Sequence, residues 1–339
     1  MNTTQLTSNG KLFFENHGKN PLLRTFSGMR LLTLMLLRFS PPLFGLLLSL
    51  PLLGCAPVSN APRPPVEAAP AVAQAQPAPL PTTAPPAISG QSGIVIDAHT
   101  GRILAGKNPD ERRAVASTQK LMTALLAVEA GPLDTPVTIA LSDTKAEPTQ
   151  LSLKPGEVYT RRQLIRVILV KSANDAAAAL ARDVAGSAEA VGDVMTRRAR
   201  ALGLHNTVFK NPHGLTVDGQ YSTARDLALL ARAAYRHPYI RECMRTRNFT
   251  FNYNDGRTRK LENTNKLLKN FPYTTGMKTG TTNASGKCLV SSADYNGRVA
   301  IAVVLKSTNG KIWNESESLL RWALSVPADP IPTETASAN

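Results

Sequence analysis

An Asn-Gly pair near the end of the chain is the feature that most constrains the fold. Asn296-Gly297 separates two runs, residues 287–294 and the apolar residues 299–305. The pair tolerates the positive φ angles of a two-residue hairpin turn, so these runs are predicted to form antiparallel strands. Residues 93–97 and 102–104 predict a second antiparallel pair around a short turn. The folded part therefore begins and ends with strands.

Helical periodicity fills most of the chain between the two strand pairs. Asn174 or Asp175 is expected to cap the third of these helices. This order of elements predicts an α/β (α+β) fold, in which one antiparallel sheet is assembled from both chain ends, flanked by helices, with a helical region inserted. The predicted helices cover residues 117–129, 161–170, 176–184, 188–202 and 223–236, and a last one covers 312–324.

The N-terminal segment has the pattern of an export signal. The apolar stretch 39–53 is short for a transmembrane helix and has the length of a signal-peptide core, so residues 1–54 are predicted to be a signal peptide. A start at Met29 or Met35 would give a more ordinary signal. Cys55 follows Leu-Leu-Gly, which resembles a bacterial lipobox, and we expect it to be lipidated. The alternative is a plain signal peptide with an incidental cysteine.

A Pro/Ala-rich segment, residues 55–90, follows the predicted lipid site. Ten of residues 56–88 are proline. Such a composition cannot build a core, and we expect an extended, disordered tether that spans up to about 100 Å. Residues 91–326 are the predicted catalytic domain, and 327–339 a flexible tail too short for another domain. The lipid would then supply the membrane anchor.

Composition excludes several classes of function. The net charge of +15 invites a nucleic-acid partner, but zinc-finger spacing and aromatic-basic interleaving are missing, so none is expected. No CxxC or HExxH motif occurs, so we expect neither a metal nor another cofactor. Cys243 and Cys288 could form a disulfide or remain buried free thiols, and the sequence leaves both open.

A serine and a lysine stand three residues apart at the start of the first predicted helix. Ser117 and Lys120 would share one face of the first turn, near free backbone N–H groups. A neutral lysine there can take the serine proton. The spacing alone is weak, because Ser8 and Lys11 share it. Alone, Ser117 reads as a helix cap and Lys120 as a solvated charge.

Two further short motifs follow along the chain. Ser172-Ala173-Asn174 lies between two predicted helices, where a helix cap is the ordinary explanation. Lys278-Thr279-Gly280 lies at a predicted strand, where the glycine would let a ligand approach closely. A strand-entry turn is the alternative for this third motif.

The order of the three motifs carries a resemblance. Ser-x-x-Lys, Ser-x-Asn and Lys-Thr-Gly follow one another as in the penicillin-interacting serine enzymes. Residues 153–157, 171–177 and 211–215 also resemble the D-alanyl-D-alanine carboxypeptidases, the low-molecular-mass penicillin-binding proteins. The resemblance covers about residues 91–324 and implies a β-lactamase/transpeptidase-like fold. His213 lies in one of these runs, and we expect its role to be structural.

The resemblance implies a role for each motif residue. Ser117 would be the nucleophile, Lys120 the general base with a pKa lowered by burial and by Lys278, and Ser172 a proton relay. The remaining residues would bind substrate. Asn174 would hold either the substrate amide or Lys120. Lys278 and Thr279 would bind the terminal carboxylate, and Gly280 would allow close approach of the substrate. The backbone amides of Ser117 and Thr281 would bind the oxyanion.

The implied activity is removal of the terminal D-alanine from peptidoglycan stem pentapeptides, with β-lactam antibiotics as covalent inhibitors. The enzyme would work outside the cytoplasm, held to a membrane by its lipid. A D,D-endopeptidase of the same fold, which cuts cross-links, is the first alternative. A β-lactamase and a non-catalytic wall-binding lipoprotein are the others. We find no acidic residue matching the loop that activates water in class A β-lactamases.

Overall fold

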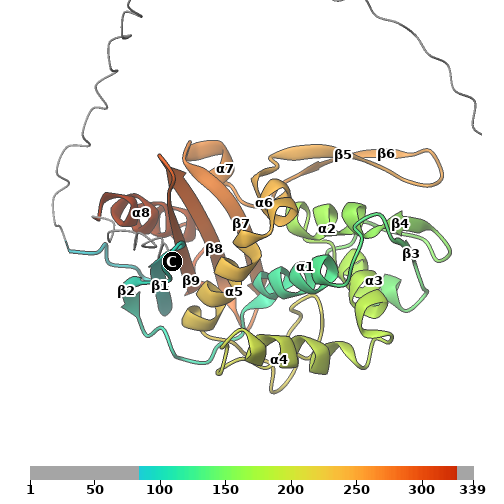
Figure 1. Ribbon diagram of the computed structural model, residues 1–339, viewed down its shortest axis with the longest axis horizontal. Coiled ribbons are helices and arrows are strands. Elements are labelled where there is room, and N and C mark those ends of the chain that lie inside the picture. Colours follow the sequence, from blue (N-terminus) through green and yellow to red (C-terminus); the bar gives the residue numbers. More distant parts are fainter. Residues whose placement is uncertain (1–83, 327–339) are drawn as a thin grey trace, which may run out of the picture. The chain divides into compact units, whose positions relative to one another are not determined.

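One five-stranded antiparallel sheet organises the molecule. The computed structural model describes residues 84–326. The strand order is β2-β1-β9-β8-β7, so the first and last strands of the chain lie side by side in the sheet (Figure 1). This confirms a sheet assembled from both chain ends. The strands are β1 (Ser92–Asp97), β2 (Ile103–Lys107), β7 (Thr274–Thr282), β8 (Gly286–Tyr295) and β9 (Arg298–Ser307).

The Asn-Gly turn joins β8 to β9 as expected. Asn296 has φ 52° and Gly297 φ 79°, the positive values that a type I′ hairpin turn requires at both central positions. Tyr295 pairs with Arg298 across the turn, and Gly297 N donates a hydrogen bond to Asp294 Oδ1 at 3.0 Å. The two strands are almost wholly buried because helices cover both faces of the sheet.

Alternate strand residues face two different hydrophobic cores. Leu289 and Val304 pack with Leu320 of the final helix, α8 (Ile312–Ser325). Val290 and Val303 belong to the larger core that contains the other helices. Figure 1 shows α8 on one side of the sheet and the helical region on the other. The side of the sheet that a residue faces therefore decides which core it joins.

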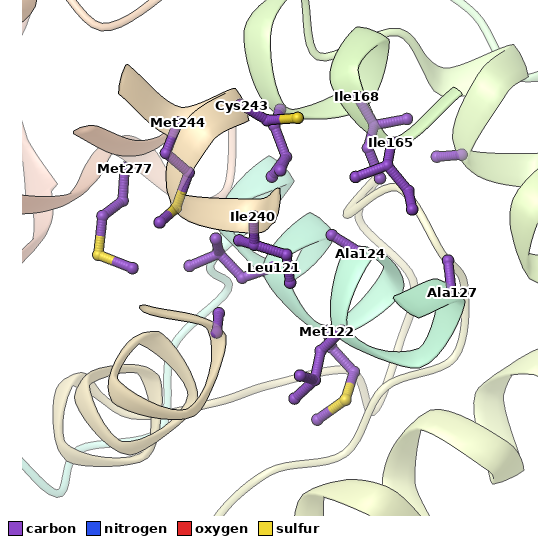
Figure 2. Close-up of a cluster of buried hydrophobic side chains, with 14 of the residues drawn as sticks. Leu121, Met122, Ala124, Ala127, Ile165, Ile168, Ile240, Cys243, Met244 and Met277 are labelled. Carbon is purple, nitrogen blue, oxygen red and sulfur yellow. The ribbon is translucent and has the colours of Figure 1, made fainter. Parts of the chain in front are cut away.

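Helix α1 lies in the middle of the larger core. Eight of its ten residues are buried, which is typical of a central helix and not of a surface one. Figure 2 shows part of this core, where Leu121 and Ala124 of α1 lie among side chains of α2 and α6. The helices before β7 are α1 (Lys120–Glu129), α2 (Arg161–Val170), α3 (Asn174–Ala185), α4 (Val191–Ala201), α5 (Ala224–Arg236), α6 (Pro238–Arg245) and α7 (Leu267–Asn270).

The predicted helix 117–129 begins differently from expectation. Residues Ala116–Gln119 form a short 3-10 turn, η1, and the α-helix starts only at Lys120. The expected capping of α3 is also wrong. Its N-cap is Ala173, without a side-chain bond, and Asp175 accepts hydrogen bonds from the loop amides of Leu151 and Leu153.

Several elements lie outside the sequence predictions. The sequence pattern does not predict two small two-stranded sheets or the helices α6 and α7, because their apolar residues are few and their runs brief. The second 3-10 turn, η2 (Asp143–Lys145), has no sequence signal either. One small sheet pairs β3 (Pro136–Thr138) with β4 (Val158–Thr160), and the other pairs β5 (Asn248–Asn252) with β6 (Thr258–Glu262).

The two cysteines of the described part are both buried free thiols. Cys243 lies in α6 and Cys288 in β8, so the disulfide left open by the sequence is not present. The predicted signal peptide, the lipid site Cys55, most of the tether and the tail 327–339 lie outside the described residues. Within residues 84–326, none of the helices has the length and apolarity needed to cross a membrane.

Candidate active site

Two glycines enclose the backbone of Ser117. A Cβ at Gly214, which has φ +89°, would lie 2.1 Å from Ala116 O and 2.7 Å from Ser117 N. A Cβ at Gly280 of β7 would lie 2.9 Å from Val115 O and 3.0 Å from Ser117 N. Because real Cβ atoms do not approach so closely, both positions require glycine. The glycine of the third motif therefore brings strand β7 directly against the η1 turn that carries Ser117.

Lys120 is completely buried beside Ser117. Its Nζ lies 2.8 Å from Ser117 Oγ, 2.7 Å from Asn174 Oδ1 and 2.7 Å from the backbone oxygen of His213. Ser117 Oγ in turn donates to His213 O at 3.1 Å. The structure thus unites the first motif with the asparagine of the second. Both ordinary explanations are wrong, because Ser117 lies inside η1 and Lys120 is 0% exposed.

The surroundings of Lys120 favour its neutral form. Burial lowers the pKa of Lys120 well below its usual 10.5, and the positive charge of Lys278 lowers it further. The carboxylate of Asp175 acts in the opposite direction. The sequence predicted this direction and its two causes.

The hydrogen-bond partners of Lys120 also set its orientation. A neutral amine has two N–H donors and one lone pair. His213 O can only accept, and Asn174 turns Oδ1 to Lys120 while its amide nitrogen contacts Glu147 O at 3.4 Å. The remaining neighbour is a hydroxyl that can donate. Ser117 Oγ carries a single proton, which is directed at His213 O in this arrangement. Rotation about the Cβ–Oγ bond turns that proton toward the lone pair of neutral Lys120, 2.8 Å away, which is the geometry that a general base requires.

Lys278 is a second completely buried lysine, in the middle of β7. Its Nζ donates to Thr279 O at 2.9 Å, and burial lowers its pKa to about 7. The Thr279 hydroxyl is 2.7 Å from the hydroxyl of Thr264. Thr281 is exposed on the same strand. The alternative of a strand-entry turn is wrong, since all of the third motif lies inside β7.

Strand β7 is the last strand of the sheet. On its other side no further strand pairs with it within residues 84–326. Such an edge offers unpaired backbone groups to an extended peptide, which can add to the sheet as a strand. Gly280 lies in this edge strand, and the η1 turn with Ser117 packs directly against it.

Ser172 lies two residues before Asn174 and is not hydrogen-bonded to Ser117 or Lys120. It has φ +67°, a conformation that costs a non-glycine residue about 1 kcal/mol or more and that gathers at functional sites. Its backbone nitrogen donates to Val167 O at 3.2 Å, and 7% of the residue is exposed. Its hydroxyl makes no hydrogen bond within the described part of the chain. It is not a helix cap either, because Ala173 holds that position.

Sequence reasoning missed two contributors to the site. The backbone oxygen of His213 contacts both Ser117 and Lys120. The His213 side chain is half-buried, and desolvation lowers its pKa to about 4. Asp175 ties down the loop whose Thr149 O accepts from Asn174 N at 2.6 Å. Backbone atoms carry no residue signal, and only Gly214, next to His213, hinted at the close approach.

The arrangement can therefore perform acyl transfer through a serine. A nucleophile, a buried base and an open strand edge meet at one place. No group of three or more His, Cys, Asp or Glu residues within 84–326 is arranged to hold a metal ion.

Comparison with known proteins identifies the family. The family model Peptidase S11, described as D-alanyl-D-alanine carboxypeptidase, matches residues 80–309. The carboxypeptidase DacF of Bacillus subtilis is 37% identical over 226 residues, which cover 65% of this chain and 58% of DacF. The D-alanyl-D-alanine endopeptidase of Escherichia coli is 32% identical over 263 residues, 76% of this chain and 84% of that protein.

Solved structures agree with the sequence relatives. The crystal structure of the carboxypeptidase DacD from Francisella tularensis superposes with a TM-score of 0.68 at 31% identity, over 74% of each chain. The chain spans less than two thirds of the length of DacF. By the family match, the sequence identity and the shared fold, this chain belongs to the D-alanyl-D-alanine carboxypeptidase family, peptidase family S11.

Proposed function

We propose that the protein is a serine D-alanyl-D-alanine carboxypeptidase that removes the terminal D-alanine of peptidoglycan stem pentapeptides. The observation that carries the proposal is the buried Lys120, whose Nζ meets Ser117 Oγ at 2.8 Å and two oxygens that can only accept. A lysine held neutral beside a serine hydroxyl is suited to activate that hydroxyl. Family membership supplies the substrate class.

In the first half of the reaction, Ser117 Oγ bonds to the carbonyl carbon between the two D-alanines while Lys120 takes its proton. The backbone amides of Ser117 and Thr281 stabilise the oxyanion. The C–N bond then breaks, and the proton passes to the departing amine of D-alanine through Ser172. In the second half, water attacks the ester, the tetrapeptide leaves, and Ser117 regains its proton.

Substrate binding is assigned to the second and third motifs. Lys278 and Thr279 bind the terminal carboxylate, and Asn174 holds Lys120 and the substrate amide. Gly280 lets the peptide approach the open edge of β7. The position of Gly280 against Ser117 N supports this assignment, because a peptide paired along that edge passes the nucleophile.

A fluorescent penicillin tests the site. The wild-type protein should be labelled covalently, and Ser117→Ala should abolish labelling. Ser325→Ala, at the end of α8, is the matched control and should be labelled like the wild type. Labelling that persists in Ser117→Ala contradicts the assignment of the nucleophile.

Release of free D-alanine from a synthetic pentapeptide tests the activity. Release at penicillin-sensitive rates supports the carboxypeptidase, whereas penicillin hydrolysis without D-alanine release would identify a β-lactamase. A protein that binds wall fragments but releases nothing would be a non-catalytic lipoprotein.

A D,D-endopeptidase is the second candidate, because the endopeptidase of Escherichia coli has 32% identity to this chain. Pentapeptide monomers and cross-linked dimers offered side by side separate the two activities. Mass spectrometry of the products should give D-alanine from the monomer for the carboxypeptidase. Cleavage of the dimer alone would establish the endopeptidase.

We further propose export by a signal peptide in residues 1–54 and lipidation of Cys55, with the protein held on the outer side of a membrane. The support is the apolar run followed by Leu-Leu-Gly-Cys. Radiolabelled fatty acid should enter the wild-type protein in bacterial cells and not Cys55→Ser. Equal labelling of both would contradict the anchor.

A further inference from the structure

Lys287 stands directly opposite Thr281 in the sheet. In the β7–β8 register, Thr281 pairs with Lys287 and Thr279 with Leu289. Paired residues of neighbouring strands point to the same face, and alternate residues share that face. Thr279, Thr281 and Lys287 therefore share the face on which Leu289 packs with the core around α8.

Lys278 belongs to the opposite face. It pairs with Val290, and Gly280 pairs with Cys288, both members of the larger helical core. Lys278 is 0% exposed, and its Nζ donates a hydrogen bond to Thr279 O. Burial lowers its pKa to about 7, so Lys278 carries only part of a positive charge at neutral pH in the empty site. A substrate carboxylate bound beside Thr281 therefore needs a cation in addition to Lys278 if its charge is to be fully neutralised.

Lys287 is free to serve as that cation. It is half-buried and makes no side-chain hydrogen bond or ion pair within residues 84–326. Ser307 faces it from β9, but that hydroxyl donates to Glu315 Oε2 at 2.7 Å. The other carboxylate oxygen of Glu315 accepts from the backbone nitrogen of Ser89 at 2.6 Å. Glu315, an acidic residue on this side, is thus already engaged by other residues.

We propose that Lys287 is a second carboxylate-binding residue, which reaches across Thr281 and contacts the C-terminal carboxylate of the substrate. The inference deepens the proposed function and rests on it. Directly opposite residues have Cβ atoms about 4.5–5.5 Å apart, and diagonal neighbours such as Thr279 remain within reach of a long side chain. Lys287 would then select peptides that carry a free carboxylate next to the scissile bond over amidated ones.

The test compares two substrates with four full-length proteins. One peptide ends in D-Ala-D-Ala with a free carboxylate, and the other ends in the carboxamide. Lys287→Gln should lower kcat/KM for the acid about tenfold and leave kcat/KM for the amide unchanged. Lys287→Arg, which keeps the charge, should retain most activity on the acid. Lys260→Gln, an exposed lysine of β6, is the matched control and should change neither value.

The rate of acylation by penicillin, which carries its own carboxylate, is an independent readout. It should fall in Lys287→Gln by a similar factor, with thermal unfolding unchanged. The proposal would be overturned if the ratio of kcat/KM for the acid to kcat/KM for the amide were unchanged in Lys287→Gln. An equal loss of kcat/KM for the acid in Lys260→Gln would overturn it too. If the wild type is acylated but releases no D-alanine, the proposed function fails while Lys287 is still judged by acylation. A wild type inert in both assays contradicts both.

Discussion

The start of α1 and the middle of β7 each hold a completely buried lysine, but the two lysines have different partners. Lys120 has three oxygen neighbours within 2.8 Å, while Lys278 has one, the oxygen of Thr279. Burial lowers the pKa of both. The comparison teaches that equal burial can serve two purposes: a fully partnered lysine is positioned as a base, and a poorly partnered one is kept for a ligand.

Lys120→Met should have the largest effect. Loss of a general base typically costs about 10²–10⁴-fold in rate, and we expect the upper end because the serine also loses its orienting neighbour. The variant should unfold at lower temperature too, since Asn174 Oδ1 and His213 O lose their donor. Stopped-flow acylation and calorimetry measure the two effects. Rapid acylation of Lys120→Met would remove the α1 lysine from the mechanism.

Glycine substitutions compare the two approaches to Ser117. Gly214→Ala should destabilise by ~2–4 kcal/mol, because its Cβ would lie 2.1 Å from a backbone oxygen at an unfavourable φ. Gly280→Ala, at about 3.0 Å, should cost less stability but slow acylation.

Gly156→Ala is the control for these substitutions. Gly156 has φ +86° with nothing within 4 Å of its Cβ, so the change should cost only about 1 kcal/mol. Urea unfolding gives the order of the three variants. If Gly214→Ala and Gly156→Ala are equally stable, the close contact at Ser117 does not exist.

The two lysines predict a bell-shaped dependence of kcat/KM on pH. The rate should rise with pH as Lys120 loses its proton, at a pH well below 10.5. It should fall above about pH 7 as Lys278 loses the charge that binds the carboxylate. The falling limb should approach tenfold per pH unit, or about 100-fold by pH 9. In Lys278→Arg the fall in kcat/KM should move to higher pH, since arginine stays charged. A flat profile from pH 7 to 9 would contradict the role of Lys278.

Lys278→Met should raise stability while it weakens substrate binding. The folded pKa of Lys278, about 7, lies below the usual 10.5, so only the unfolded state holds the proton between these values. Wild-type stability therefore rises with pH across this window, and the cost of burial is fully present below pH 7. Methionine removes that cost, and we expect a gain of ~1–3 kcal/mol at pH 6.5.

Urea unfolding of the wild type and of Lys278→Met at pH 6.5 and pH 9 measures the gain in the free energy of unfolding. It also shows whether the variant has lost the dependence of that free energy on pH. Lys260→Met, on the exposed strand β6, should keep the wild-type dependence on pH. A Lys278→Met protein less stable than the wild type would mean that the β7 lysine is as well partnered as Lys120.

The sequence by itself determined the sheet and the three motifs. Asn296-Gly297 predicted the hairpin because its conformational requirement is local, and the predicted helix 161–170 has its observed bounds because its apolar periodicity is local too. The weaker elements, such as β5 and β6, depend on packing against distant residues. Their short runs carry little signal of their own.

Only the tertiary structure decided how the motifs meet. The contact of His213 O with Lys120 joins residues 93 positions apart through a backbone atom, which no side-chain pattern encodes. The closeness of Gly280 to Ser117 and the pairing of Thr281 with Lys287 likewise come from sheet register and helix packing. Local preferences select elements, but distances between elements follow from how the buried surfaces fit together.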